Sequence, residues 1–136
     1  MSEIADFLRA RYAERRALAE AASPGPWRAN AENDEVVADD GITVAEGFAL
    51  SGRQLRATVD HIVANDPTDV IADLDAKLAI VDLHAPVELA GLGELMDACA
   101  VCEVTGKYPE FPCQTLRILA QPFAGHPGHK GEDWTP

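Results

Sequence analysis

The sequence has few of the residues that would give a small protein a covalent or aromatic framework. Only three of its 136 residues are cysteine, and 6% are aromatic. An odd number of cysteines cannot pair completely within one chain, and the first residues show no basic segment followed by a long apolar run. We therefore expect a cytoplasmic protein with reduced thiols, whose core consists mainly of Leu, Ile, Val and Ala.

Basic side chains are also scarce. The chain carries 23 acidic and 11 basic residues, which gives a formal net charge of −12. A field of this sign repels phosphate groups, so it argues against direct nucleic-acid binding, whereas it suits a basic protein partner. No stretch approaches the roughly 20 continuous apolar residues that span a membrane, so we expect no membrane contact.

The motifs of several common enzyme classes are missing as well. The sequence contains no G-x-S-x-G, no P-loop, no G-x-G-x-x-G and no H-E-x-x-H. Without them the sequence indicates no serine nucleophile, no phosphate-binding loop and no zinc-protease helix. We expect a protein that is not an enzyme.

What the sequence does contain is a series of helix and strand signals over a length typical of one domain. The prediction is a single α+β domain, residues 1–136, with three main helices, a small antiparallel hairpin or three-stranded sheet, and a cysteine-rich C-terminal corner. The predicted segments are a helix in 1–22, a β-hairpin region in 27–50, two helices in 52–84, a cysteine-rich knuckle and helix in 99–123, and a tail in 124–136.

Proline, glycine and aspartate mark the boundaries of these segments. Ser23-Pro24-Gly25-Pro26 ends the first helix, because its two prolines cannot continue a helix. Asp40-Gly41 lies between two β-favouring runs and predicts a hairpin turn. Asp66-Pro67 is a typical helix start, with an acidic cap and proline at the first helical position.

Helical spacing also predicts which side chains are buried. On the first helix, Ile4, Phe7, Leu8 and Leu18 are expected to face the core. Residues 94–98 are expected to form a short turn of helix. On the long helix that ends near residue 84, the predicted core face consists of Val70, Ile71, Leu74, Leu78 and Val81.

All three cysteines, Cys99, Cys102 and Cys113, fall close together in the sequence. A C-x2-C pair can supply two zinc ligands from one tight turn, and a turn predicted at 106–109 suits a zinc knuckle. Pro112 precedes Cys113 and helix-forming residues follow it, so this thiol is expected at a helix start, where the helix dipole favours the thiolate. We therefore predict a structural zinc site.

The fourth ligand has to be another residue type, because the chain has no further cysteine. His84 is preferred, since it ends the predicted long helix, and His126, His129 and His61 follow in that order. Three thiolates and one imidazole suit zinc better than iron. Two alternatives remain: a redox-active Cys99/Cys102 pair, and thiols that bind no metal.

Several motifs in combination resemble a known family. They are the Ser23-Pro-Gly-Pro-Trp27 turn, the Cys113-Gln-Thr-Leu-Arg117 run and the His126-Pro127 pair. The chain is similar over nearly its whole length to small uncharacterised actinobacterial and actinophage proteins that form a domain of unknown function. This resemblance implies a phage or mobile-element setting and favours His84 and Cys113 as ligands, but it implies no established activity, cofactor or partner.

The resulting hypothesis is a small acidic, non-enzymatic protein that contains structural zinc and binds another protein. One alternative is an acidic decoy that occupies a nucleic-acid-binding protein of the host. The other is a small thiol-dependent enzyme or redox protein that uses Cys99 or Cys102.

Overall fold

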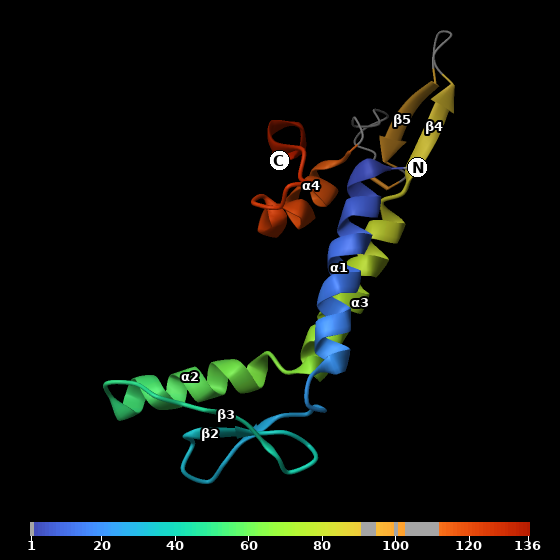
Figure 1. The fold of residues 1–136 in the computed structure, drawn as a ribbon. Helices are drawn as coiled ribbons and strands as arrows, with labels where there is room; N and C mark the ends of the chain where they lie inside the picture. The colour runs from blue at the N-terminus through green and yellow to red at the C-terminus, as the bar shows by residue number, and fades with distance from the viewer. Residues whose placement is uncertain (1, 91–94, 100, 103–111) are drawn as a thin grey trace. The chain divides into compact units, whose positions relative to one another are not determined.

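The computed structural model describes residues 2–90, 95–99, 101–102 and 112–136. Helices and antiparallel strands make up this part of the chain, which confirms the α+β class (Figure 1). The turn predicted at 106–109 lies outside the described residues. The helices are α1 (Glu3–Ala21), α2 (Gly52–Ala64), α3 (Pro67–Leu83), α4 (Gln114–Ala120) and the short 3-10 helices η1 (Gln121–Phe123) and η2 (Gly131–Trp134). The strands are β1 (Arg28–Ala29), β2 (Glu35–Val37), β3 (Thr43–Glu46), β4 (Pro86–Ala90) and β5 (Leu95–Cys99).

The chain divides into two compact units, which are described in turn. Unit 1 consists of Met1–Ala13 and Ala76–Pro136, and unit 2 of Glu14–Asp75. Unit 1 contains the three cysteines and His84. None of the helices in the described part of the chain is long and apolar enough to cross a lipid bilayer.

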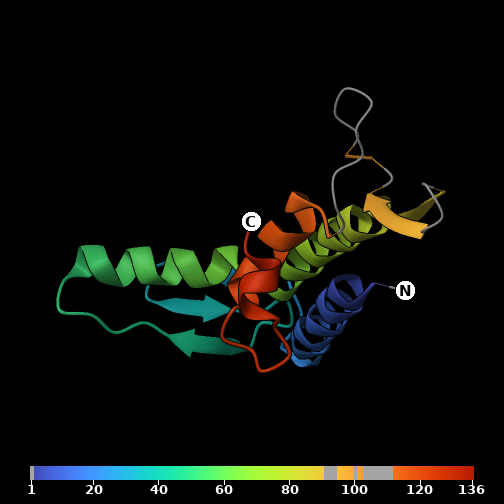
Figure 2. The same ribbon diagram turned by 90° about the horizontal axis from the view of Figure 1, so that it is seen from above.

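Unit 2 is built around an antiparallel sheet with the strand order β1-β2-β3. The predicted Asp40-Gly41 turn joins β2 to β3, and Gly41 has a φ of 84°, a conformation that glycine adopts without steric cost. The helix α2 lies along this sheet and contacts β1 and β2 (Figure 1, Figure 2). Val36 of the sheet and Val59 of α2 are fully buried, so the sheet and helix share a small apolar core.

Asp66, which lies between α2 and α3 in unit 2, has a buried carboxylate that makes two hydrogen bonds. Asp66 Oδ1 accepts a hydrogen bond of 2.8 Å from the Asp69 N–H and so caps α3, as the sequence predicted. Its Oδ2 accepts a bond of 2.9 Å from the Trp27 N–H. Asp66 is only 3% exposed, and it ties the segment that follows α1 to the start of α3.

Four of the few aromatic side chains of this protein form a cluster in unit 1. The ring of Phe7 lies 5.1 Å from that of Trp134 and 6.1 Å from that of Phe123, measured between centroids. Tyr12 lies 5.9 Å from Phe123. The C-terminal segment is therefore packed onto the first part of α1 by aromatic contacts, which add to the energy of simple burial.

Two expectations about packing and local structure are wrong. Leu18 is 74% exposed, and Tyr12 and Ala19 take the buried positions instead. Its angle around the helix does not explain this, because at about 100° per residue Leu18 lies between Ile4 and Phe7, which are both buried. Phe7 is covered by Phe123 and Trp134 in unit 1, whereas Leu18 belongs to the part of α1 in unit 2 and lines an open cavity. Residues 95–98 belong to β5 and not to a helical turn, because β4 offers them a partner strand with Val87 opposite Ala98.

Candidate metal centre

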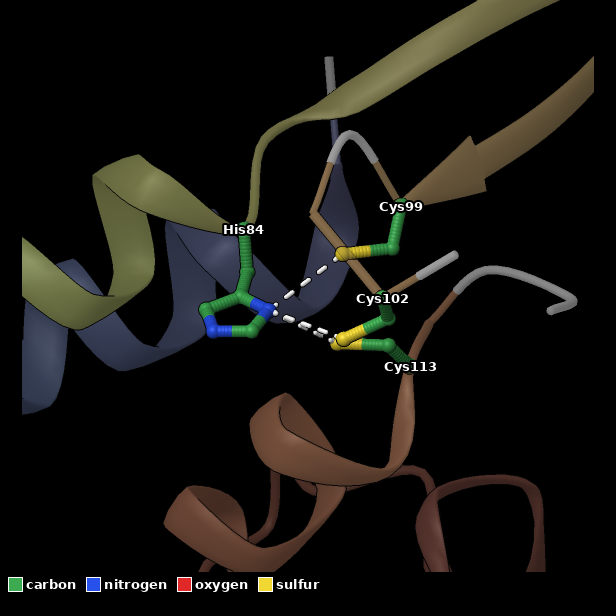
Figure 3. A group of neighbouring side chains, drawn as sticks. All are labelled: His84, Cys99, Cys102 and Cys113. Carbon is green, nitrogen blue, oxygen red and sulfur yellow. Dashed lines mark hydrogen bonds between the residues drawn. The ribbon is translucent and has the colours of Figure 1, made fainter. Parts of the chain in front are cut away.

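Four side chains from separate segments of unit 1 converge on one point (Figure 3). His84 directly follows α3, Cys99 is the last residue of β5, Cys102 comes three residues later, and Cys113 immediately precedes α4. The ligand atoms of all four lie within 4.8 Å of one another. The structure thus brings together His84 and all three cysteines.

The β4–β5 hairpin explains how His84 meets Cys99 across 15 residues of sequence. His84 extends the last turn of α3, since its N–H donates to the Ile80 carbonyl at 3.1 Å. The chain then turns directly into β4, whose first residue, Pro86, lies opposite Cys99 in the register of the two strands. This pairing returns the chain to the end of α3, and the Cys99 Sγ lies 3.3 Å from the His84 Nδ1.

Cys113 is held by the start of α4. Its carbonyl accepts a hydrogen bond of 3.2 Å from the Arg117 N–H, which makes it the capping residue of the helix. The thiol takes no part in the capping. Instead, Figure 3 shows the sulfur directed at the imidazole, with its Sγ 3.5 Å from the His84 Nδ1.

The separations fit a tetrahedral ion. With Zn–S bonds of about 2.3 Å and a Zn–N bond of about 2.0 Å, a regular tetrahedron places N and S roughly 3.5 Å apart and two sulfurs roughly 3.8 Å apart. The three observed N–S distances are 3.2, 3.3 and 3.5 Å, the shortest of them to Cys102. The donor atoms are therefore close to the spacing that zinc requires.

Hydrogen bonding alone does not account for this arrangement. The Nδ1 of an imidazole has either one lone pair or one N–H, so it satisfies one sulfur and not three. The cysteines are all free thiols, with no disulfide among them. A cation at the centre of the group would satisfy all four donors at once, which is why the cluster is compatible with a metal site.

The sulfurs perturb one another's protonation. Burial raises the pKa of Cys102 to about 12, together with its hydrogen bond to Cys99 and the charge of Cys113. Burial also raises the pKa of Cys99, but hydrogen bonds from the Val101 backbone and the Cys102 side chain outweigh it, and the net shift is downward. A thiol with a raised pKa holds its proton at neutral pH, so a metal ion that binds here has to displace it.

The other three histidines lie outside the cluster. His126 and His129 pack edge-on against Phe7, with ring centroids 5.5 and 6.0 Å from it. Their Nδ1 atoms accept hydrogen bonds from the backbone N–H groups of Gly128 and Gly131. His61 is exposed on α2, in unit 2. Among the four candidates that the sequence left open, the structure therefore brings only His84 to the cysteines.

The sequence-based prediction missed the strand that positions Cys99. The signal for it was present, because Gly91 and Gly93 separate two apolar runs, as in a hairpin.

A redox pair usually opens a helix, but of the three cysteines only Cys113 directly precedes one in the described part of the chain.

Comparison with known proteins places the chain in a family. A family model covers residues 1–136, and the family is described as one of unknown function, DUF6221. The chain belongs to this family. No curated protein and no solved structure matches it. Because membership in DUF6221 specifies no activity, an argument about function has to start from the cluster.

Proposed function

We propose that His84, Cys99, Cys102 and Cys113 bind one structural zinc ion, and that this DUF6221 protein is a non-enzymatic module that binds another protein. The observation that supports the proposal is the convergence of four donor atoms within 4.8 Å. Catalytic zinc sites usually have three protein ligands and keep a fourth position for water or substrate. Here the chain supplies four donors, so the site is closed and serves the fold.

The ion would act as a cross-link within unit 1. It would join the end of α3 at His84 to the end of β5 and the start of α4, whose cysteines follow His84 by 15 and 29 residues in sequence. The β4–β5 hairpin has only two strands, and such a hairpin is marginally stable by itself. Coordination would fix its open end, because the free energy of metal binding adds to that of folding.

The charge of the chain guides the choice of partner. A net charge of −12 favours a partner with a basic surface and disfavours nucleic acid and anionic membranes. A phage or mobile-element setting, as the family resemblance implies, accords with a small protein that acts on a host protein. Capture from the native host tests this part: a basic protein released by raised salt is the expected result, and capture insensitive to salt contradicts it.

Metal analysis tests the site. Untagged protein is expected to contain about one equivalent of zinc, with thiols that react with a thiol reagent only after a chelator has removed the metal. The variants His84→Ala and Cys113→Ser should lose zinc, whereas the matched control His61→Ala, on exposed α2, should keep it. Less than about half an equivalent, with three freely titratable thiols, would overturn the proposal.

A second measurement uses the wild-type protein, so that the test does not depend on variants that fold. Cobalt(II) added to reduced, metal-free wild-type protein should bind in a one-to-one ratio and give the intense thiolate-to-metal absorption and visible bands of a tetrahedral site. Addition of zinc should then remove these bands. Weak octahedral bands without thiolate absorption would contradict a site of three sulfurs and one imidazole.

A further inference from the structure

Unit 2 has an open groove between the last part of α1 and the first part of α3. The two helix segments are joined by the ion pair of Arg16 with Asp75. Beside it lies a cavity of about 400 Å³, and apolar side chains from both helices and from Trp27 form much of its wall. The apolar residues at its wall include Leu18, Ala22, Trp27, Val70 and Leu74.

Carboxylates line one side of this groove. Asp73 belongs to the wall of the large cavity, and both Asp69 and Asp73 line an adjoining cavity of about 210 Å³. Arg15 also lines the large cavity. In the part of the chain that the structure describes, the carboxylate of Asp69 has no ion pair. An apolar groove with acidic residues on its side suits a ligand that is apolar and basic.

The loop between β3 and α2, residues 47–51, carries exposed apolar side chains that suit this groove. Phe48 is 84% exposed and Leu50 is fully exposed, which leaves an aromatic and an aliphatic side chain together in water. The base of the loop is firmly held: the Gly47 N–H donates to the Asp34 carbonyl at 2.7 Å, and Ser51 caps α2. The apolar tip is thus presented by an anchored segment.

Basic residues directly follow the tip. Residues 47–59 contain no acid, although the chain as a whole has 23, and they include Arg53 and Arg56 in the first turns of α2. Both arginines are exposed, and neither has an ion pair among the residues that the structure describes. The loop and the groove therefore complement each other in polarity and in charge.

We propose that the groove of one molecule binds the loop of a second copy of the same chain. Phe48 and Leu50 would enter the apolar cavity beside Trp27, and Arg53 and Arg56 would face Asp69 and Asp73. Each copy carries one loop and one groove, so a two-fold symmetric pair satisfies both contacts at once. The contact lies wholly within unit 2, and it does not depend on the metal site of unit 1.

Sedimentation equilibrium of the whole chain, as purified, tests the proposal. The wild-type chain is expected to pass from monomer to dimer as its concentration rises through the micromolar range. The double variant Phe48→Ser/Leu50→Ser should stay monomeric, whereas the control Ile42→Ser, at a residue that is 63% exposed but outside the loop, should dimerise normally. A monomeric wild type, or a dimer that persists in the loop variant, overturns the proposal.

Charge reversal makes the test specific to this pair of surfaces. A chain with Arg53→Glu/Arg56→Glu has acidic loop and groove, and a chain with Asp69→Arg/Asp73→Arg has basic loop and groove. Each alone should dimerise at least about tenfold more weakly than wild type, because like charges then face each other, and an equimolar mixture should form the heterodimer. A mixture that remains monomeric, or a loop that binds anionic vesicles while the protein stays monomeric, contradicts the proposal.

Discussion

At Gly47 the absence of a side chain lets the backbone of the loop lie against α2. A Cβ built at this residue would lie 2.6 Å from the Leu55 Cδ1 and 2.8 Å from the Val59 Cγ2, both closer than real carbon contacts allow. Gly41 differs, because no atom lies within 4 Å of its Cβ position and glycine is favoured there by its φ of 84°. The two glycines therefore serve different purposes, one steric and one conformational.

The replacement Gly47→Ala should lower the free energy of unfolding by about 1–3 kcal/mol, because the added methyl group overpacks the contact with α2. Urea denaturation measures it. Gly41→Ala is the control without a clash and should cost roughly 1 kcal/mol for its backbone conformation. The double variant Gly47→Ala/Leu55→Ala should lose less free energy of unfolding than the sum of the losses in the two single variants, because the shortened side chain makes room for the methyl group. Strict additivity would contradict the steric account.

At the scale of the element, the start of α3 is held by a local cap and by a contact with a residue distant in sequence. Proline at the first helical position and an aspartate cap predicted its beginning at Pro67. The sequence did not predict that the same carboxylate also holds Trp27, 39 residues earlier in the chain. That second bond makes the cap a tertiary contact as well as a local one.

Asp66→Ala should therefore cost more than an ordinary cap. Loss of the cap is worth about 1 kcal/mol, and the Trp27 N–H left without its acceptor about 1–3 kcal/mol more, so we expect a total loss of about 2–4 kcal/mol in urea denaturation. Asp66→Asn keeps one acceptor oxygen and should lose less. The control is Asp69→Ala, whose carboxylate is exposed, and equal losses for the two alanine variants would count against this role of Asp66.

The hairpin of β4 and β5 marks the limit of local reasoning about elements. Residues 95–98 resemble a helical turn because Leu, Met and Ala favour helices, but pairing with β4 overrides this preference. A partner strand is not visible in the propensities of a single segment. The contact of Cys99 with His84 depends on the same strand pairing. The donor types that zinc prefers suggested this contact, but the separation of 15 residues in sequence gave no sign of it.

At the scale of the whole molecule, the two units should respond differently to metal removal. The proposed zinc joins segments of unit 1 only, whereas the sheet and α2 belong to unit 2. Treatment with a chelator should speed amide hydrogen exchange in β4 and α4 and leave exchange in β2 and α2 nearly unchanged. Mass spectrometry of peptides from both units measures this, with metal-restored protein as the control. Equal loss of protection in both units would show that the ion does not act locally.

The sequence by itself determined the class of the fold, the ends of the helices and the grouping of three thiols with a histidine. The ends of the helices follow from local chemistry, because caps and turns act within a few residues of one another, and the grouping follows from the donor types that zinc prefers. Only the tertiary structure decided which histidine meets the cysteines, which side of α1 is buried and where the groove and the exposed loop lie. Those properties depend on contacts between residues distant in sequence, such as Trp27 with Asp66 and His84 with Cys113, and local preferences do not specify such contacts.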